Sequence, residues 1–567
     1  MKKKILAISL LSLSALPLMS SSCFNVPWNL WMLKNNKSSF LIKETPFKNL
    51  ANNHYNINSN SIKLYFKANE KQPYVSIEEM INKLYGLFNT RSLIKKHYNT
   101  NPEVNYINPY GERMVINYQN DYIKLLSDDF FSFVKKSDST NYSRHLNYLG
   151  FNINNKESIP KTITLDLAKY NIDIVYENNK ILIPLSVFNT LFCSQNYYNL
   201  YYNGSTIFGT FFDLNDKVPQ IESLKIGNWN NEKENDIDRI NNYNNLLFTL
   251  DYFYGLKDFK NIKSFKEYIS PDLKSKLLSL DPEEYNQGYS DLFYKNLNEL
   301  HTSMRMFGFF TNNMKKISME VLDKSTTLKQ YRTLLKKLKE DRENLNKEHA
   351  KKGYIVKNKT AYIIFNSFDS ATNEELKQKK YEKDSFESIR QKLYLISNQH
   401  PEVKNVILDI SQNGGGNLGA MIRVLGLLTN KDIQTNNFNT LSRADITYKY
   451  KVDANKDKNY EDKDAFDNFN YFILTGKNTF SAANAFAGVI KELKIGKIIG
   501  QKSGGGTSSI MPIVMQDGTS VIISSQSTSY FKNNDKNINL ELGVPVDIEI
   551  EYNNFYNLDY LISKIEN

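Results

Sequence analysis

The sequence is short of cysteine and of long hydrophobic runs, and each shortage excludes a class of protein. Only two cysteines occur among 567 residues, too few for a small secreted fold that is held together by several disulfides. A single long apolar run, residues 5–19, excludes a membrane protein with many spans. Hydrophobic residues make up 41% and aromatic residues 13% of the chain, which is too much for a wholly disordered protein. We therefore expect folded domains with apolar cores.

Positive charge is in excess, but its distribution argues against a nucleic-acid partner. The formal net charge is +11, and three of these charges lie at residues 2–4. The other lysines and arginines alternate with acidic residues, as in the segment 336–347. No stretch combines basic residues with interleaved aromatic side chains, the pattern that follows a phosphate backbone. We therefore expect charged, solvated faces and no nucleic-acid binding.

The amino terminus has the pattern of a targeting signal. The apolar run 5–19 is too short to span a bilayer comfortably and has the length of a secretory signal. Small residues and then Cys23 follow, which resembles a bacterial lipoprotein signal, although Ser20 stands where leucine is commonest. The resemblance implies that residues 1–22 are removed and that a lipid on Cys23 tethers the protein to the extracytoplasmic face of the cell membrane. A plain secretion signal or an uncleaved anchor is the alternative.

Composition divides the next 200 residues into two parts. Residues 23–63 are rich in Asn, Ser and Lys and predict a tether. Residues 64–230 are strand-like, with a hairpin turn at Asn178-Asn179, and resemble the small domain named after the amino-terminal region of copper amine oxidases. We expect a packing or docking role for this β-rich module, which has no His, Cys or carboxylate cluster at metal-ligand spacing. Cys193 is expected to be a buried apolar thiol.

Residues 235–349 predict helices. Five apolar side chains of the segment 290–307 fall on one stripe at helical spacing: Phe293, Leu297, Leu300, Met304 and Phe307. This stripe predicts an amphipathic helix that also carries His301. The charged segment 323–347 predicts a solvent-facing helix or linker.

The last part, residues 350–560, alternates strands and helices, which predicts a sheet with covering helices. Strands are expected at 361–368, 404–410, 471–476 and 497–500. The helix after Asp384 places Phe386, Ile389, Leu393 and Ile396 inward. The predicted fold class of the whole chain is therefore α/β (α+β) and multidomain.

Two strand ends in this part carry residues that suit catalysis. Gly414, Gly415 and Gly416 follow one strand and let the backbone approach a ligand closely, or else simply supply positive φ. Ser481 follows the next strand, where a helix begins, so its hydroxyl would meet free N–H groups and the positive end of the helix dipole. The alternative is that Ser481 is an ordinary N-cap.

Taken together, the motifs "VILDISQNGGG", "FILTGKNTFSAANAFAG" and "KIIGQKSGGGT" resemble the catalytic core of the tail-specific (carboxyl-terminal processing) and tricorn-core serine peptidases. The resemblance implies a mixed-sheet core of the ClpP/crotonase kind. It also implies that Ser481 attacks a peptide carbonyl, while the N–H groups of Ala482 and of Gly414 or Gly415 form the oxyanion hole.

The resemblance leaves the general base less well defined. Processing peptidases use a lysine about 25 residues after the serine, where this chain has Gly506, and Lys497 and Lys502 lie out of register. Tricorn-like members use a histidine, and "NELHTS" places His301 in a matching context. A glutamate then orients the imidazole, which points to Glu541 just before "GVPVD"; the alternative is that Glu541 is an outward residue of a strand.

The interval between His301 and the first core strand is about 50 residues of charged helix, too short for the peptide-binding PDZ domain of processing peptidases. The expectation is a membrane-tethered, extracytoplasmic serine endopeptidase acting on proteins or peptides, with no metal and no organic cofactor. Its oligomeric state stays open. The alternative is an inactive peptidase-fold lipoprotein that serves in binding or adhesion.

Overall fold

The computed structural model describes residues 40–98, 100–154, 162–212, 221–310, 317–533 and 536–566. The predicted signal and Cys23 lie outside these residues. The predicted tether 23–63 is wrong from residue 41 onward, because Leu41–Asn49 forms strand β1. The side chains of β1 are mostly exposed, so its sequence shows no alternation, and backbone pairing with two neighbouring strands holds it in place.

Two sheets form the amino-terminal part. Their strands are β1 (Leu41–Asn49), β2 (Ser61–Phe66), β3 (Pro73–Ser76), β4 (Ile94–His97), β5 (Glu103–Ile107), β6 (Arg113–Asn117), β7 (Tyr122–Leu125), β9 (Ile163–Asp166), β10 (Val175–Glu177), β11 (Lys180–Pro184), β12 (Tyr198–Tyr202) and β13 (Ile207–Phe211), with helices α2 (Ile77–Lys83) and α3 (Leu185–Phe188). The strand orders are β10-β11-β3-β2-β1-β13-β12 and β4-β5-β6-β7-β9. Asn178 and Asn179 turn the β10–β11 hairpin with φ of 50° and 62°, which confirms that prediction.

Helices dominate the next part. They are α4 (Ile221–Lys225), α5 (Asp236–Phe253), α6 (Phe265–Tyr268), α7 (Pro271–Leu277), α8 (Pro282–Ser290), the π-helix η7 (Asp291–Leu297), α9 (Met319–Asp323), α10 (Thr326–Asp341) and α11 (Glu343–His349). The predicted helix over 290–307 is wrong beyond Leu297, because Asn298 adopts a left-handed conformation (φ 44°) and ends it. His301 therefore lies in a bend just before strand β14 (Ser303–Met306), not on a helix.

The carboxyl-terminal core is built on a six-stranded sheet of order β15-β16-β17-β20-β21-β25. The strands are β15 (Ile355–Lys357), β16 (Thr360–Ile364), β17 (Asn405–Asp409), β20 (Asn470–Thr475), β21 (Gly496–Gly500) and β25 (Ile548–Glu549), and the helices are α12 (Asn373–Lys377), α13 (Ser385–Gln399), α14 (Leu418–Leu428), α15 (Ala482–Leu493) and α16 (Leu558–Ile565). The four predicted strands are all present, and the four predicted inward residues of α13 are buried.

Alternate side chains of this sheet enter different cores. Ile363, Leu408 and Ile473 pack against α13, α14 and α15, whereas the neighbouring Ile364 and Leu474 pack on the opposite face near α10 and α16. Because β16, β17, β20 and β21 are parallel, their carboxyl ends lie at one edge. The loops that follow β17 and β20 are therefore neighbours, which brings the glycine-rich segment and Ser481 together.

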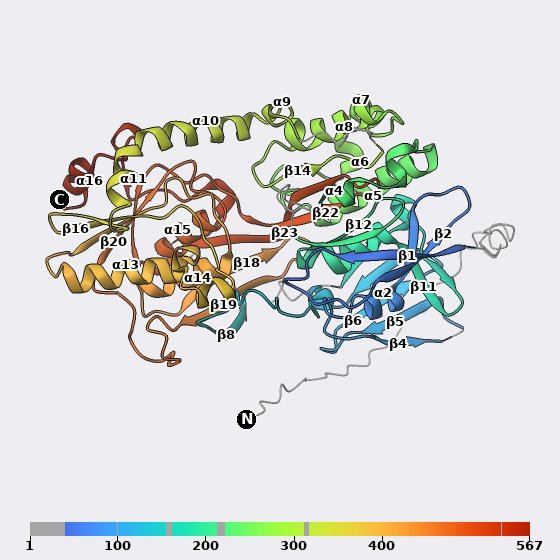
Figure 1. Ribbon diagram of the computed structural model, residues 1–567, viewed down its shortest axis with the longest axis horizontal. Helices are drawn as coiled ribbons and strands as arrows, with labels where there is room; N and C mark the ends of the chain where they lie inside the picture. The colour runs from blue at the N-terminus through green and yellow to red at the C-terminus, as the bar shows by residue number, and fades with distance from the viewer. Residues whose placement is uncertain are drawn as a thin grey trace, which may run out of the picture. The chain divides into compact units, whose positions relative to one another are not determined.

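A second sheet joins the parts of the chain that sequence composition separates. Its strands are β8 (Leu146–Ile153), β14, β18 (Ile433–Asn439), β19 (Asp445–Val452), β22 (Ser508–Val514), β23 (Ser520–Asn533) and β24 (Lys536–Asn539). Strand β14 of the helical part pairs with β23, and β8 of the amino-terminal part pairs with β19 (Figure 1). The fold is thus mixed α/β with several sheets, as predicted. Among the described residues, no helix is both long enough and apolar enough to cross a membrane.

Candidate active site

Ser481 lies at a strained turn between β20 and α15. Its backbone has φ 57° and ψ −124°, a conformation that L-residues rarely adopt and that costs on the order of 1–3 kcal/mol. Two backbone hydrogen bonds hold the turn: Ser481 N–H donates to Gly505 O (3.0 Å) and Phe480 N–H donates to Asn413 O (3.0 Å). The serine side chain makes no capping bond to the helix. Its hydroxyl is thus not used as an N-cap, and the simple structural alternative for Ser481 fails.

The glycine triplet, residues 414–416, lies directly against this turn. A Cβ on Gly415 (φ +108°) would come within 2.7 Å of Ser481 Cβ and 3.0 Å of Ala482 N. The N–H of Gly415 donates to Asn413 Oδ1 at 2.9 Å. Within the part of the chain that the structure describes, the N–H groups of Gly414 and Ala482 donate to no other group. Of the two glycines predicted for the oxyanion hole, Gly414 is therefore the one whose amide is uncommitted.

Asp409 and Asn413, two buried polar residues of the motif "VILDISQNGGG", hold the strand and the glycine triplet in place. Asn413 is fully buried, and its Nδ2 donates to Phe365 O at 3.1 Å, which shapes the glycine triplet. Asp409 is also fully buried and accepts hydrogen bonds of 2.7 Å from both Arg342 Nη1 and Tyr362 Oη. Because Arg342 lies at the end of α10, this ion pair ties that helix to the sheet.

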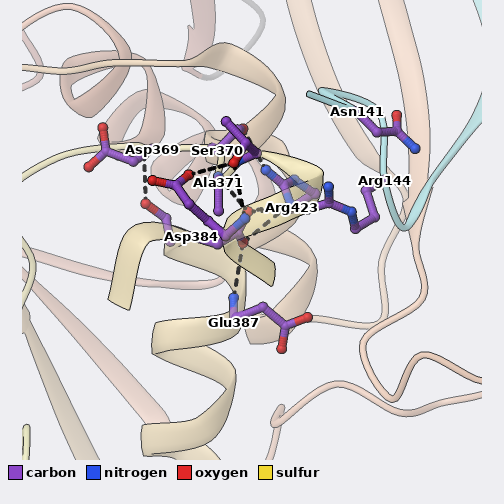
Figure 2. Close-up of polar contacts among 12 residues, drawn as sticks. Asn141, Arg144, Asp369, Ser370, Ala371, Asp384, Glu387 and Arg423 are labelled. Carbon is purple, nitrogen blue, oxygen red and sulfur yellow. Dashed lines mark hydrogen bonds and ion pairs between the residues drawn. The ribbon is translucent and has the colours of Figure 1, made fainter. Parts of the chain in front are cut away.

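Polar side chains fix the start of α14, the helix that follows the triplet, and Figure 2 shows three of them: Ser370, Asp384 and Arg423. Asn417 caps α14 by accepting a hydrogen bond from Ala420 N, and it also accepts one from Ser370 Oγ at 3.2 Å. Ser370 in turn accepts a 2.7 Å hydrogen bond from Arg423, which is buried against Asp384 at 3.3 Å. The start of α14, and with it the triplet, is therefore anchored to a buried ion pair.

The loop 503–507 explains why a Ser–Lys dyad is absent. Gly506 has φ +85°, and a Cβ there would lie 2.7 Å from the Phe480 ring and 2.9 Å from Ser481 N. No side chain fits at this position without moving the serine turn. Lys497 is exposed on β21, and among the described contacts neither it nor Lys502 reaches Ser481.

His301 approaches the serine turn from the helical part of the chain. Its ring centroid is 4.6 Å from that of Phe480, the residue before Ser481. Burial lowers the pKa of His301, and the charge of Glu299 partly opposes this effect. The imidazole is therefore neutral near neutral pH, the form that accepts a proton. No hydrogen bond joins the His301 ring to Ser481 among the described residues.

Glu541 lies against the loop 503–507, which contacts the serine turn. It belongs to the short 3₁₀ turn Leu540–Leu542, not to a strand, so the alternative of an outward strand residue is wrong. Its Oε2 accepts the N–H of Thr507 at 2.9 Å, and burial, with Glu299 nearby, raises the pKa of its carboxyl group. The structure thus brings Glu541 to the loop 503–507, and no described hydrogen bond connects it to His301.

Two residues near the site were not predicted from the sequence. Glu299 accepts hydrogen bonds from the turn that carries His301. Tyr331 of α10 places its hydroxyl 3.0 Å from a Cβ built on Gly414, and the N–H₂ of Asn478 donates to Tyr331 O at 2.9 Å. The acidic residue two positions before His301 was a usable signal, whereas no local pattern indicates Tyr331.

Cysteine and metal chemistry have no counterpart in the described site. Cys193 is fully buried as predicted, and burial raises the pKa of its thiol well above the ordinary value. Across the described ranges, no three His, Cys, Asp or Glu side chains gather as metal ligands would.

Comparisons with known proteins find a peptidase family in the carboxyl-terminal core. Residues 359–550 match the family model described as Peptidase family S41, which confirms the peptidase resemblance of the carboxyl-terminal core. Similar solved structures include the photosystem II D1 C-terminal processing protease (19% identity, 34% of this chain and 42% of that chain, TM-score 0.25). Others are a lipoprotein from Streptococcus agalactiae (15% identity, 53% and 88%, TM-score 0.32) and the tricorn protease (16%, 48% and 23%, TM-score 0.23).

The extent of these matches is limited. This chain covers less than half of the D1 processing protease. Among curated proteins, none matches the chain. The similarity of residues 64–230 to the amine oxidase module stays a prediction.

Proposed function

We propose that this chain, whose residues 359–550 form a Peptidase family S41 domain, is a serine endopeptidase that cleaves peptide bonds through an acyl-enzyme. The observation that carries the proposal is that the hydroxyl of Ser481 makes no capping bond to helix α15. Ser481 stands at a left-handed strand-to-helix turn, against Gly415 and beside the uncommitted N–H of Ala482. Protein or peptide substrates follow from that chemistry.

The proposed reaction uses Ser481, two backbone N–H groups beside it, and His301, whose ring packs on Phe480. Ser481 Oγ attacks the peptide carbonyl and His301 takes its proton. The N–H groups of Ala482 and Gly414 donate hydrogen bonds to the oxyanion of the tetrahedral intermediate. Each such donor typically raises kcat by about 10²- to 10³-fold. His301 then protonates the departing amine, and water, activated by the same imidazole, hydrolyses the acyl-enzyme. No cofactor takes part in this scheme.

We also propose that the enzyme acts outside the cytoplasm as a lipid-anchored protein. The support is the sequence before Cys23, an apolar run followed by small residues. Two acyl chains on Cys23 would suffice for stable anchoring. Cys23→Ser should move the protein from the membrane fraction to the soluble fraction and abolish labelling by a palmitate analogue. A Cys193→Ser protein is the matched control and should stay membrane-bound.

Two observations favour a second candidate, an inactive peptidase fold that binds other molecules. Gly506 replaces the dyad lysine, and His301 is not hydrogen-bonded to Ser481 in the described structure. Catalytic hydrogen bonds are often long before substrate binds, so this geometry is compatible with both candidates.

A fluorophosphonate probe separates the two candidates. The wild-type protein should be labelled at Ser481 and should digest casein, and Ser481→Ala should do neither. His301→Ala should slow labelling at least 100-fold. Ser563→Ala on α16 and His400→Ala after α13 serve as matched controls and should behave as wild type. A folded wild-type protein that is inert to the probe would favour the binding alternative.

A further inference from the structure

Glu299 lies two residues before His301, and its carboxylate gathers three donors. Oε2 accepts the backbone N–H of His301 at 2.6 Å. Oε1 accepts the hydroxyl of Ser524 at 3.0 Å and the hydroxyl of Thr302. Glu299 is only 8% exposed, and among the described residues no Lys, Arg or His side chain forms an ion pair with it, which is unusual for a buried glutamate. Such charge-assisted hydrogen bonds are roughly twice as strong as neutral ones.

The bond to Ser524 attaches the His301 bend to strand β23 of the second sheet. The bend has no regular structure of its own, because η7 ends at Leu297 and β14 begins at Ser303. Ser524 belongs to β23, the strand with which β14 pairs. The opposite side of Ser524 is also fixed, since Gly255 N–H donates to Ser524 O at 2.8 Å. Glu299 is therefore the link between a turn without regular structure and a rigid strand.

Titratable and polar groups of three neighbouring elements face Glu299. The 3₁₀ turn Leu540–Leu542 contributes Glu541, which faces Glu299 and is itself faced by Lys260. The end of α5 contributes Tyr254, whose pKa is raised by burial, Glu299 and Glu541. From β23 the facing group is the Ser524 hydroxyl. Phe480 is the ring neighbour of His301.

Glu541 has a different attachment. Its carboxylate accepts the N–H of Thr507 and so holds the loop 503–507 behind Ser481. The carboxylate bonded to the residue His301 itself is that of Glu299.

We propose that Glu299 is the positioning residue of His301: it fixes the bend that presents the imidazole to Ser481 and supplies the negative charge beside it. This inference rests on the proposed peptidase function. It assigns to Glu299 the orienting role for which the sequence indicated Glu541, and leaves Glu541 the support of the glycine loop.

The two halves of this role have separable consequences. The hydrogen bonds set the geometry of the bend, so their loss lowers kcat. The charge favours the imidazolium, so its loss lowers the pKa of His301. A general base acts when deprotonated, and activity is therefore lost as pH falls through that pKa. Removing the charge must shift the acidic limb of kcat/KM to lower pH.

The test measures kcat/KM against pH for the full chain with a fluorogenic peptide. Glu299→Gln keeps the size of the side chain and removes the charge. We expect a 10- to 100-fold loss of kcat, on the order of the cost of removing a supporting partner, and an acidic limb displaced downward by about one pH unit. Ser524→Ala removes one donor and keeps the charge, so kcat should fall with the limb in place. Glu541→Gln should leave the limb within about 0.3 pH units.

Several outcomes overturn the proposal. A limb that moves in Glu541→Gln but not in Glu299→Gln assigns the role to Glu541. If Glu299→Gln has the kcat of the wild type and the same acidic limb of kcat/KM, Glu299 does not position His301. If Glu299→Gln does not fold by circular dichroism, Glu299→Asp replaces it: the charge stays but the reach is shorter, so kcat must fall while the limb stays, and a wild-type kcat refutes the idea. A wild-type protein without labelling or cleavage instead sinks the proposed function itself.

Discussion

Gly415→Ala is the sharpest test of the way the fold places its serine. A Cβ at this position would lie 2.7 Å from Ser481 Cβ, 2.9 Å from Phe480 O and 3.0 Å from Ala482 N. Two of these three atoms belong to the backbone, so they cannot rotate away. Ordinary contact begins near 3.4 Å, and the gap to Ser481 must therefore open by several tenths of an ångström.

The cost follows from two effects. A left-handed backbone costs a non-glycine residue about 1–2 kcal/mol, and forced overpacking costs about 1–3 kcal/mol. A displacement of about 1 Å at a reacting group lowers the rate on the order of 100-fold. We therefore expect Gly415→Ala to lower the free energy of unfolding by on the order of 2–5 kcal/mol and fluorophosphonate labelling by on the order of 100-fold.

Gly414→Ala is the matched control for this experiment. Its added Cβ would meet one atom, the Tyr331 hydroxyl at 3.0 Å, which is the end of a side chain that can turn aside. Its N–H remains in place, so labelling should fall less than 10-fold, in keeping with a small geometric change. Labelling rates and thermal unfolding of both variants check the prediction. Equal labelling by Gly415→Ala and wild type would show that the triplet does not confine Ser481, and the proposed oxyanion geometry would then be refuted.

Three further predictions concern stability and reactivity. Burial lowers the pKa of His349 to about 4, below its ordinary value of 6.5. The unfolded chain therefore binds more protons in this range, and the melting temperature should fall from pH 6.5 to pH 4, less steeply in His349→Gln; parallel slopes would contradict this. Arg342→Met leaves the buried Asp409 carboxylate unpaired and should cost about 3–5 kcal/mol in urea unfolding. Arg332→Met, which breaks a more exposed ion pair, should cost at most about 1 kcal/mol, and equal losses would refute the distinction. Cys193 should resist thiol reagents until the protein unfolds, because it is fully buried; stoichiometric labelling of the native state would be contrary evidence.

Sequence alone determined the features that depend on local periodicity. The inward stripe of α13, the four central strands of the core and the hairpin at Asn178-Asn179 all lie where the pattern predicts them. In each case the residues that specify the element are within a few positions of one another. The placement of Ser481 at the start of a helix is of the same kind, because the strand before it and the apolar stripe after it are both visible in the sequence.

Tertiary structure decided the features that depend on distant neighbours. The apolar stripe over 290–307 predicts a helix, yet the chain leaves the helix at Asn298, which is left-handed (φ 44°), and residues 303–306 pair with the distant strand β23 instead. The first four side chains of strand β1 are exposed, so its sequence gives little sign of a strand, and its backbone pairs with β2 and β13. Strand β8 likewise pairs with β19 of the second sheet, although its sequence lies in the amino-terminal part.

The candidate site shows the same division. The motifs identified Ser481, the glycine triplet and His301, but not which carboxylate serves the histidine. That choice depends on where β23 brings Ser524 and where the loop 503–507 brings Thr507, contacts that span 225 and 34 residues of chain. A one-dimensional pattern records which chemical groups are present. Only the folded backbone, through its strand pairing and its left-handed turns, decides which of them come within hydrogen-bonding distance.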